Sequence, residues 1–178
     1  KNSHGEALGI TGIGRDASDK KRAEVALYGF QEDLERQVLS RTDDLKRTHQ
    51  LLQDVIDSSP DWIFVKDLDH RFLLVNRSFA ASQGLRPSDM HGHVDSEFWP
   101  LELCEGNPAK GIRGFHADDR EAFQGKLVRN EYDPATLQDG SKRIFDTYKG
   151  PLWHADGHVY GVLSYARDTT ERHVAEKE

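Results

Sequence analysis

The sequence has little of what anchors a chain to a membrane, a metal cluster or a nucleic acid. Its 178 residues contain one cysteine, Cys104, which excludes an internal disulfide and any cysteine-clustered zinc or iron–sulfur site. No apolar run approaches the ~20 residues that span a bilayer. The net charge of −7 disfavours a broad surface for nucleic acid or anionic lipid. We expect no nucleic-acid partner, no membrane contact by this chain and a cytoplasmic location, although the parent protein could be membrane-anchored.

The two ends of the sequence repeat one another. Gly9–Glu24 aligns without gaps with Gly161–Glu176, and both contain Arg-Asp, a hydroxyl residue and Ala-Glu in the same order. Each copy indicates a strand followed by the start of a charged helix. We therefore predict that residues 1–17 are the tail strand of a preceding domain of the same type, within a tandem array.

A long helix is predicted over residues 18–57. This stretch lacks proline, Ser18 can cap its N-terminus, and Pro60 ends it. At alternating steps of four and three, six of nine positions are apolar. They are Leu27, Leu34, Val38, Leu45, Leu52 and Val55. Because a lone helix of this length is marginal in water, we expect these residues to form the seam of a parallel homodimeric coiled coil. A monomeric helix folded back on the domain is the alternative.

From residue 58 to residue 168 the pattern changes to short strands separated by turn residues. The predicted strands are 62–66, 71–75, 130–137, 142–153 and 158–167. A helix over 77–83 follows a cap at Asn76, helical turns and loops fill 85–114, and another helix covers 116–128. This order predicts an α+β fold: a five-stranded antiparallel sheet with short helices on one side, preceded by the long N-terminal helix. Residues 169–178 should begin a C-terminal helix.

Three stretches of this region resemble a PAS sensor domain: Ser58–Asp67, Arg71–Phe79 and Asp156–Arg172. Glu35–Leu45 is similar to the signalling coiled coils that join such domains to each other and to an output. The resemblance implies that a ligand or cofactor between sheet and helices shifts the last strand, which reorients the following helix. We expect Asp168 and Thr170 to couple strand to helix, with Thr170 as its cap; an ordinary cap without a switching role is the alternative.

Aromatic residues and one serine are the candidates for the ligand pocket, although we expect most of the aromatic residues to be core rather than ligand contacts. They are Trp62, Phe64, Phe72, Phe79, Phe98, Trp99, Phe115, Tyr148 and Ser164. The cofactor is unknown. Haem or flavin is possible but not indicated, because Cys104 lacks the Asn-Cys-Arg context of flavin photochemistry and no histidine stands out as an axial ligand. No third ligand accompanies the histidine pairs, so no metal site is expected.

Two functions remain open. The first is a sensory domain that binds a small ligand or cofactor and relays a signal through coiled-coil helices to an output domain outside this chain. The second is a ligand-free dimerisation and relay module whose pocket is filled by its own side chains. The sequence contains no nucleophile triad, phosphate loop or carboxylate pair, so we expect no enzymatic activity here. The covalently linked output of the parent could be a histidine kinase or a diguanylate cyclase.

Overall fold

The computed structural model describes residues 15–176, with side chains from residue 18 onward. It divides into two compact units, Lys1–Gln50 and Leu51–Glu178, described separately below. The predicted tail strand lies outside the described residues up to position 14, and residues 15–17 are helical rather than extended. Between residues 15 and 176, no helix has the length and apolar character that crossing a membrane requires.

The long helix α1 spans Arg15–Asp57. It begins three residues before Ser18, so the prediction that Ser18 caps it is wrong; neither proline nor glycine interrupts the chain between Arg15 and Ser18. Helix α1 ends at Asp57, as predicted. Intrahelical ion pairs such as Arg22 with Asp19 support its polar surface. The six predicted seam residues are each 48–71% exposed, so an apolar stripe is uncovered in the single chain.

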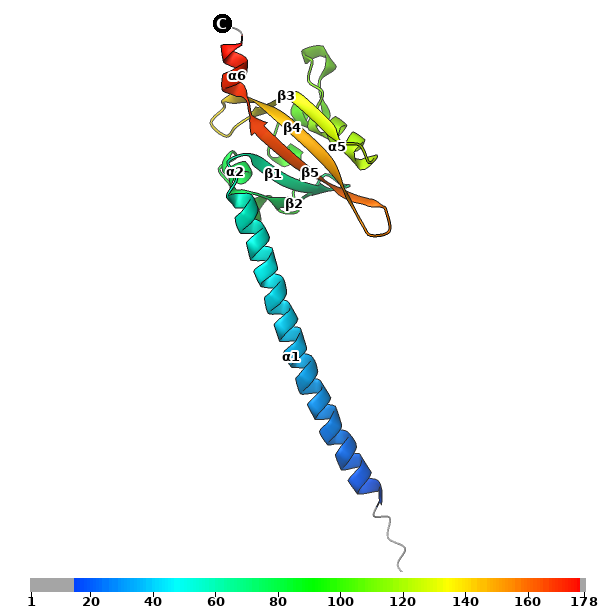
Figure 1. The fold of residues 1–178 in the computed structure, drawn as a ribbon. Helices are drawn as coiled ribbons and strands as arrows, with labels where there is room; N and C mark the ends of the chain where they lie inside the picture. Colours follow the sequence, from blue (N-terminus) through cyan, green and yellow to red (C-terminus); the bar gives the residue numbers. More distant parts are fainter. Residues whose placement is uncertain (1–14, 177–178) are drawn as a thin grey trace, which may run out of the picture. The chain divides into compact units, whose positions relative to one another are not determined.

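The second unit is built on one antiparallel sheet of five strands in the order β2-β1-β5-β4-β3 (Figure 1). The strands are β1 (Trp62–Asp67), β2 (Phe72–Val75), β3 (Val128–Thr136), β4 (Lys142–Trp153) and β5 (Val159–Asp168). β5 is the central strand and pairs with β1 and β4 along its length. Pro134 lies in β3, where a missing N–H is tolerated because β3 is at the edge. The predicted fold class is confirmed.

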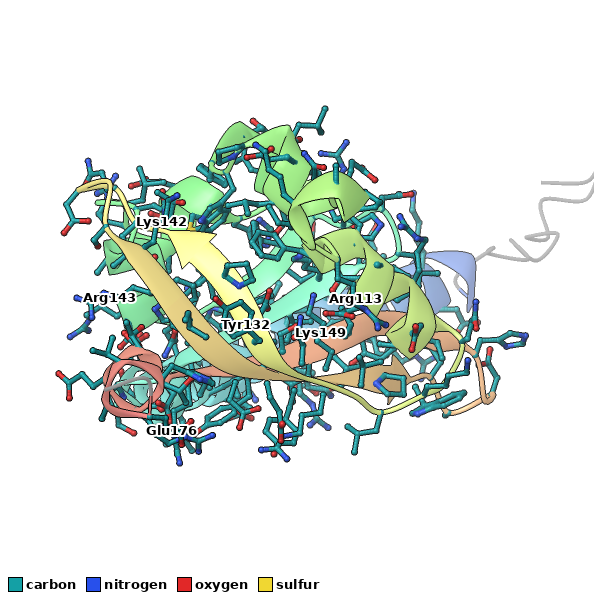
Figure 2. All side chains as sticks on the ribbon, turned by 90° about the horizontal axis from the view of Figure 1, so that it is seen from above. Arg113, Tyr132, Lys142, Arg143, Lys149 and Glu176 are labelled. Carbon is teal, nitrogen blue, oxygen red and sulfur yellow. The ribbon has the colours of Figure 1, made fainter. Side chains whose placement is uncertain are left out.

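Short helices follow β2 and lie against one face of the sheet. They are α2 (Arg77–Ala81), α3 (Pro87–Met90), α4 (Leu101–Glu105) and α5 (Phe115–Phe123), with 3-10 turns at Asp95–Glu97 and Pro108–Lys110. Figure 2 shows α5 lying across the sheet. Helix α5 ends five residues earlier than predicted, because Gly125 adopts a left-handed φ of 85° and turns the chain into β3. A final helix, α6 (Thr170–Ala175), follows β5.

One buried side chain, Asn76, joins three elements of this unit. Its Nδ2 donates to the carbonyl oxygens of Ile56 at 3.1 Å and Asp61 at 2.9 Å. Its Oδ1 accepts from the backbone N–H groups of Ile63 and Phe79, both at 3.1 Å. The expected cap of α2 therefore also fixes the end of α1 to the start of β1.

Two glycines on neighbouring strands provide a test of the central packing. A Cβ on Gly161 of β5 would lie 2.4 Å from the carbonyl oxygen of Lys66, whereas on Gly150 of β4 the nearest atom is a leucine methyl at 3.5 Å. We expect Gly161→Ala to lower the free energy of unfolding by about 1–3 kcal/mol, because the backbones of β1 and β5 must separate. Gly150→Ala is the matched control and should leave it nearly unchanged. Urea unfolding measures both, and equal losses would contradict the close approach.

Candidate functional site

A cavity lies between the inner face of the sheet and the helices. Its apolar wall contains Trp62, Phe64, Phe79, Trp99, Phe115, Ala135, Phe145 and Ala166, and its polar wall contains Lys66, Asp95, Asp133, Thr147 and Lys149. The volume of the cavity, counted over the positions that the centre of a water molecule can occupy, is about 30 Å³. Since one water needs ~10–15 Å³ by this measure, the cavity holds about two waters or a similarly compact group.

Strand alternation creates this mixed wall. Side chains two residues apart on a strand share a face, so Trp62, Phe64 and Lys66 of β1 all point inward. The same period brings Phe145, Thr147 and Lys149 inward from β4.

The aromatic side of the wall is closely packed. The Trp62 and Phe145 rings have centroids 3.9 Å apart, and Phe79 stacks on Phe64 at 4.4 Å. Trp99, from the segment before α4, also stacks on Phe79, with ring centroids 5.4 Å apart. The two strands and the helical layer are thus held together by ring contacts around the cavity.

A network of buried charges forms the polar end. Lys66 Nζ donates to Asp95 Oδ2 at 2.7 Å and to Asp119 Oδ2 at 3.0 Å. Lys149 Nζ, which lies between sheet and α5 (Figure 2), donates to Asp119 Oδ1 at 2.6 Å and to the carbonyl oxygen of Phe115 at 2.9 Å. All four charged side chains are at most 3% exposed. Two ammonium groups therefore balance two carboxylates inside the domain.

The pKa shifts follow from this pairing. Burial alone would raise the pKa of Asp119, but the ammonium groups of Lys149 and Lys66 hold it well below its usual range. Burial also acts upward on the pKa of Asp95, and Lys66 and a hydrogen bond from His116 bring it below its ordinary value. For Lys66, burial acts downward and the two carboxylates raise its pKa. Lys66, Asp95 and Asp119 are accordingly charged at neutral pH.

Two stacked histidines extend the network towards the helices. His70 and His116 have ring centroids 3.9 Å apart. His70 Nδ1 lies 3.1 Å from Asp119 Oδ2, and His116 Nε2 lies 3.2 Å from Asp95 Oδ2. The other ring nitrogen of His116 is 2.9 Å from Glu105 Oε1. The hydrogen bond with Asp95 raises the pKa of His116. The contribution of protonated His116 to stability is therefore complete at acid pH, and it is lost as the pH rises through the folded-state pKa of His116.

Asp133 is the one charged group of the cavity wall without an ion-pair partner within residues 15–176. It lies on β3, opposite Phe145 of β4. Burial raises the pKa of Asp133 to about 6, although Lys149 opposes the shift. The two lysines of the wall pair with Asp95 and Asp119. The carboxylate of Asp133 is therefore in excess of the lysine charges around the cavity.

The structure brings together five of the nine predicted pocket residues: Trp62, Phe64, Phe79, Trp99 and Phe115. Phe72 and Phe98 belong to the same aromatic cluster but lie behind the wall. Ser164 is fully buried and pairs in register with Phe64 and Lys149, yet it does not reach the wall.

Tyr148 lies outside the interior of the domain, which corrects the prediction. It is 36% exposed and lies on the outer face of the sheet, paired with Tyr165, with the Arg129 guanidinium 4.9 Å from its ring centroid. The reason is strand period: Thr147 and Lys149 point into the cavity, so the residue between them points out.

The prediction of the pocket from aromatic residues does not include the polar wall. Lys66 and Lys149 stand at inward positions of their strands, two residues from Phe64 and Thr147. Asp119 follows Phe115 by four residues, which places both on one face of α5. A lysine at an inward strand position is the signal that could have indicated a buried ionic partner.

The predicted coupling residues meet at the end of β5. Asp168 Oδ1 accepts from the N–H of Thr170 at 2.9 Å and from its hydroxyl at 2.5 Å, and the Thr170 hydroxyl accepts from the N–H of Ile144 at 3.0 Å. Thr170 is the first residue of α6 and Thr169 occupies the cap position, so the prediction that Thr170 caps the helix is wrong. Asp168 receives the first helical N–H instead, and Thr170 ties the junction to β4.

Within the described part of the chain, no group of three or more His, Cys, Asp or Glu side chains is placed to hold a metal ion. The lining of the cavity consists of hydrogen-bonding and ring-stacking groups. Its chemistry suits a compact molecule that has both a polar and an apolar side.

Comparison of the sequence with protein families matches residues 56–174 to the PAS fold. Among curated proteins, the methanogenesis regulatory histidine kinase FilI of Methanothrix harundinacea is 30% identical over 127 residues, which are 71% of this chain and 13% of FilI. The aerobic respiration control sensor protein ArcB of Escherichia coli is 25% identical over 121 residues, 68% of this chain and 14% of ArcB. The chain thus spans about one seventh of the length of these curated relatives.

Solved structures with a similar fold include VqmA bound to DPO, with a TM-score of 0.53, 23% identity, and coverage of 68% of this chain and 56% of that chain. The PAS domain of BvgS from Bordetella pertussis has a TM-score of 0.51 and 21% identity, covering 76% of this chain and 96% of that chain. At these identities the likeness concerns the fold.

Removal of one network cation tests the polar end of the cavity. We expect Lys66→Met to lower the free energy of unfolding at pH 7.5 by about 3–5 kcal/mol, because Asp95 and Asp119 stay buried with less positive charge. Their pKa values should rise in the variant, so the deficit should shrink towards pH 4.5, where the carboxylates gain protons. Lys126→Met, at an exposed lysine, is the control and should behave as wild type. A deficit that is independent of pH would contradict the network.

Proposed function

The chain belongs to the PAS family, and on that premise we propose that it senses a compact small molecule in the cavity and relays the change through β5 and α6. As a PAS domain of the kind present in sensor histidine kinases, it has a signal-sensing regulatory role. The observation that supports ligand binding is the mixed cavity wall, with stacked rings at one end and charged groups at the other. VqmA, which has a similar fold, is known bound to DPO.

The cavity volume limits the ligand. About 30 Å³ suits a group of few heavy atoms, whereas a haem or flavin ring system would have to displace several rings of the wall. We therefore favour a small metabolite over a large cofactor.

The relay route is short. Ala166 of β5 lies in the cavity wall, and two residues later Asp168 receives the first N–H of α6. Because β5 is hydrogen-bonded to β1 on one side and to β4 on the other, a shift of β5 also changes its hydrogen bonds with both strands. A ligand that binds one position of β5 better than another would change the direction of α6.

The partners follow from the helices on either side of the PAS domain. The exposed apolar seam of α1 supports a parallel homodimer, in which each helix covers the stripe of the other. The output of the parent protein is proposed to be a kinase domain, because the relative FilI is a regulatory histidine kinase.

A second candidate is a ligand-free dimerisation and relay module. It is favoured by the small cavity and by the pairing of Lys66 and Lys149 with protein carboxylates. In this case two waters would fill the space, and signals would arrive only along the helices.

Native and denaturing mass spectrometry of the purified chain distinguish the two candidates. We expect each native subunit to carry the extra mass of one small organic molecule, lost on denaturation. A weak ligand could be lost during purification. A second native spectrum is therefore recorded after the protein has been equilibrated with a metabolite extract. Subunits of bare mass in both spectra would contradict ligand sensing and favour the relay module.

The dimer seam is tested by matched substitutions on α1. We expect Leu45→Asp to dissociate the dimer in sedimentation velocity, because a carboxylate would enter the seam of both helices. Leu39→Asp places the same change on an exposed leucine outside the seam and should leave the dimer intact. Dimers of equal stability in the two variants would rule out this seam.

A further inference from the structure

We propose that the cavity selects a compact organic cation, such as a small protonated amine, which the Asp133 carboxylate holds among the aromatic rings of the wall. This rests on the proposed sensory function and names the class of its ligand. Three properties of the cavity support it: its charge balance, its ring content and the protonation state of Asp133.

The charge balance leaves one carboxylate over. Lys66 and Lys149 are each within 3.0 Å of carboxylate oxygens of Asp95 or Asp119, and these two pairs cancel. Asp133 has no such partner among residues 15–176. A cation would match the surplus charge, whereas an anion would add a second unmatched charge to a buried site.

The rings around the cavity favour the same class. Six aromatic side chains line it: Trp62, Phe64, Phe79, Trp99, Phe115 and Phe145. Ring faces attract a desolvated cation, and several rings beside one carboxylate is a common arrangement for holding an ammonium group. A neutral apolar ligand would use the rings but leave the Asp133 carboxylate without an ion-pair partner.

The protonation state of the site supports an ionic ligand at neutral pH. With a pKa raised to about 6 by burial, Asp133 is ionised at pH 7.5 and mostly neutral at pH 5. The charged groups around it are Lys149 on β4, Asp118 and Asp119 on α5, and the pair of Lys66 and Asp95 behind them. His116, between Asp95 and Glu105, also gains a proton at acid pH, which would likewise disfavour a cation.

Three probes of similar size test the class: ethylammonium chloride, sodium acetate and ethanol, at an ionic strength matched with sodium chloride. Binding is followed by tryptophan fluorescence, since Trp62 and Trp99 lie in the wall, and by the midpoint of thermal unfolding. The variants are Asp133→Asn and, as matched control, Glu131→Gln, which removes an exposed carboxylate from the same strand.

The expected result is saturable binding of ethylammonium to wild type and to Glu131→Gln at pH 7.5, with at least tenfold weaker binding to Asp133→Asn. Wild-type affinity should fall about tenfold at pH 5, as the ionised fraction of Asp133 falls. This pH titration tests the proposal even if the asparagine variant does not fold.

Equal affinity of wild type and Asp133→Asn, or binding that does not change between pH 7.5 and pH 5, would overturn the assignment of Asp133. Saturable binding of acetate or ethanol but not of ethylammonium would overturn the cation class and leave the sensory function standing. Failure of all three probes, together with bare masses in the native spectra, would overturn both proposals.

Discussion

Lys66 on β1 and Lys149 on β4 both reach the carboxylate of Asp119 on α5, and the rest of the domain is arranged around that shared contact. The two strands are separated by β5, so the aspartate links the sheet across its central strand. The same lysines form the polar end of the cavity, and the histidines bound to their carboxylates connect it to α4 and α5. Because an unpaired charge here would cost several kcal/mol, the network fixes the distance between sheet and helices.

This placement gives the cavity two different ends. Stacked rings close the apolar end, and the matched charges leave Asp133 as the remaining group that can take a charged ligand. The wall also includes Ala166, close to the junction where Asp168 receives α6. Under the proposed function, recognition and output would share one strand. The uncovered seam of α1 supplies a second helix through which dimer partners could be coupled.

Much of the fold could be predicted from local signals. Asp-Gly turns, the Asn76 cap and period-two patterns locate all five strands to within a few residues, because turn chemistry and strand period act locally. The buried network could not be predicted in this way, since Asp95 and Asp119 meet Lys66 only through tertiary packing. The outward position of Tyr148 differs from the prediction for a related reason: an aromatic residue suggests burial, but the inward position of Lys149 decides the face of its neighbour.

The central claim, that Lys149 and Asp119 form a buried pair on which the domain depends, is tested most directly by a double-mutant cycle. The free energies of unfolding of Lys149→Met, Asp119→Asn and the double variant would be measured with urea at pH 7.5. The account predicts a coupling energy of about 2 kcal/mol or more, because the second substitution removes a buried charge that has already lost its partner in this pair. Losses that add within ~0.5 kcal/mol would contradict it.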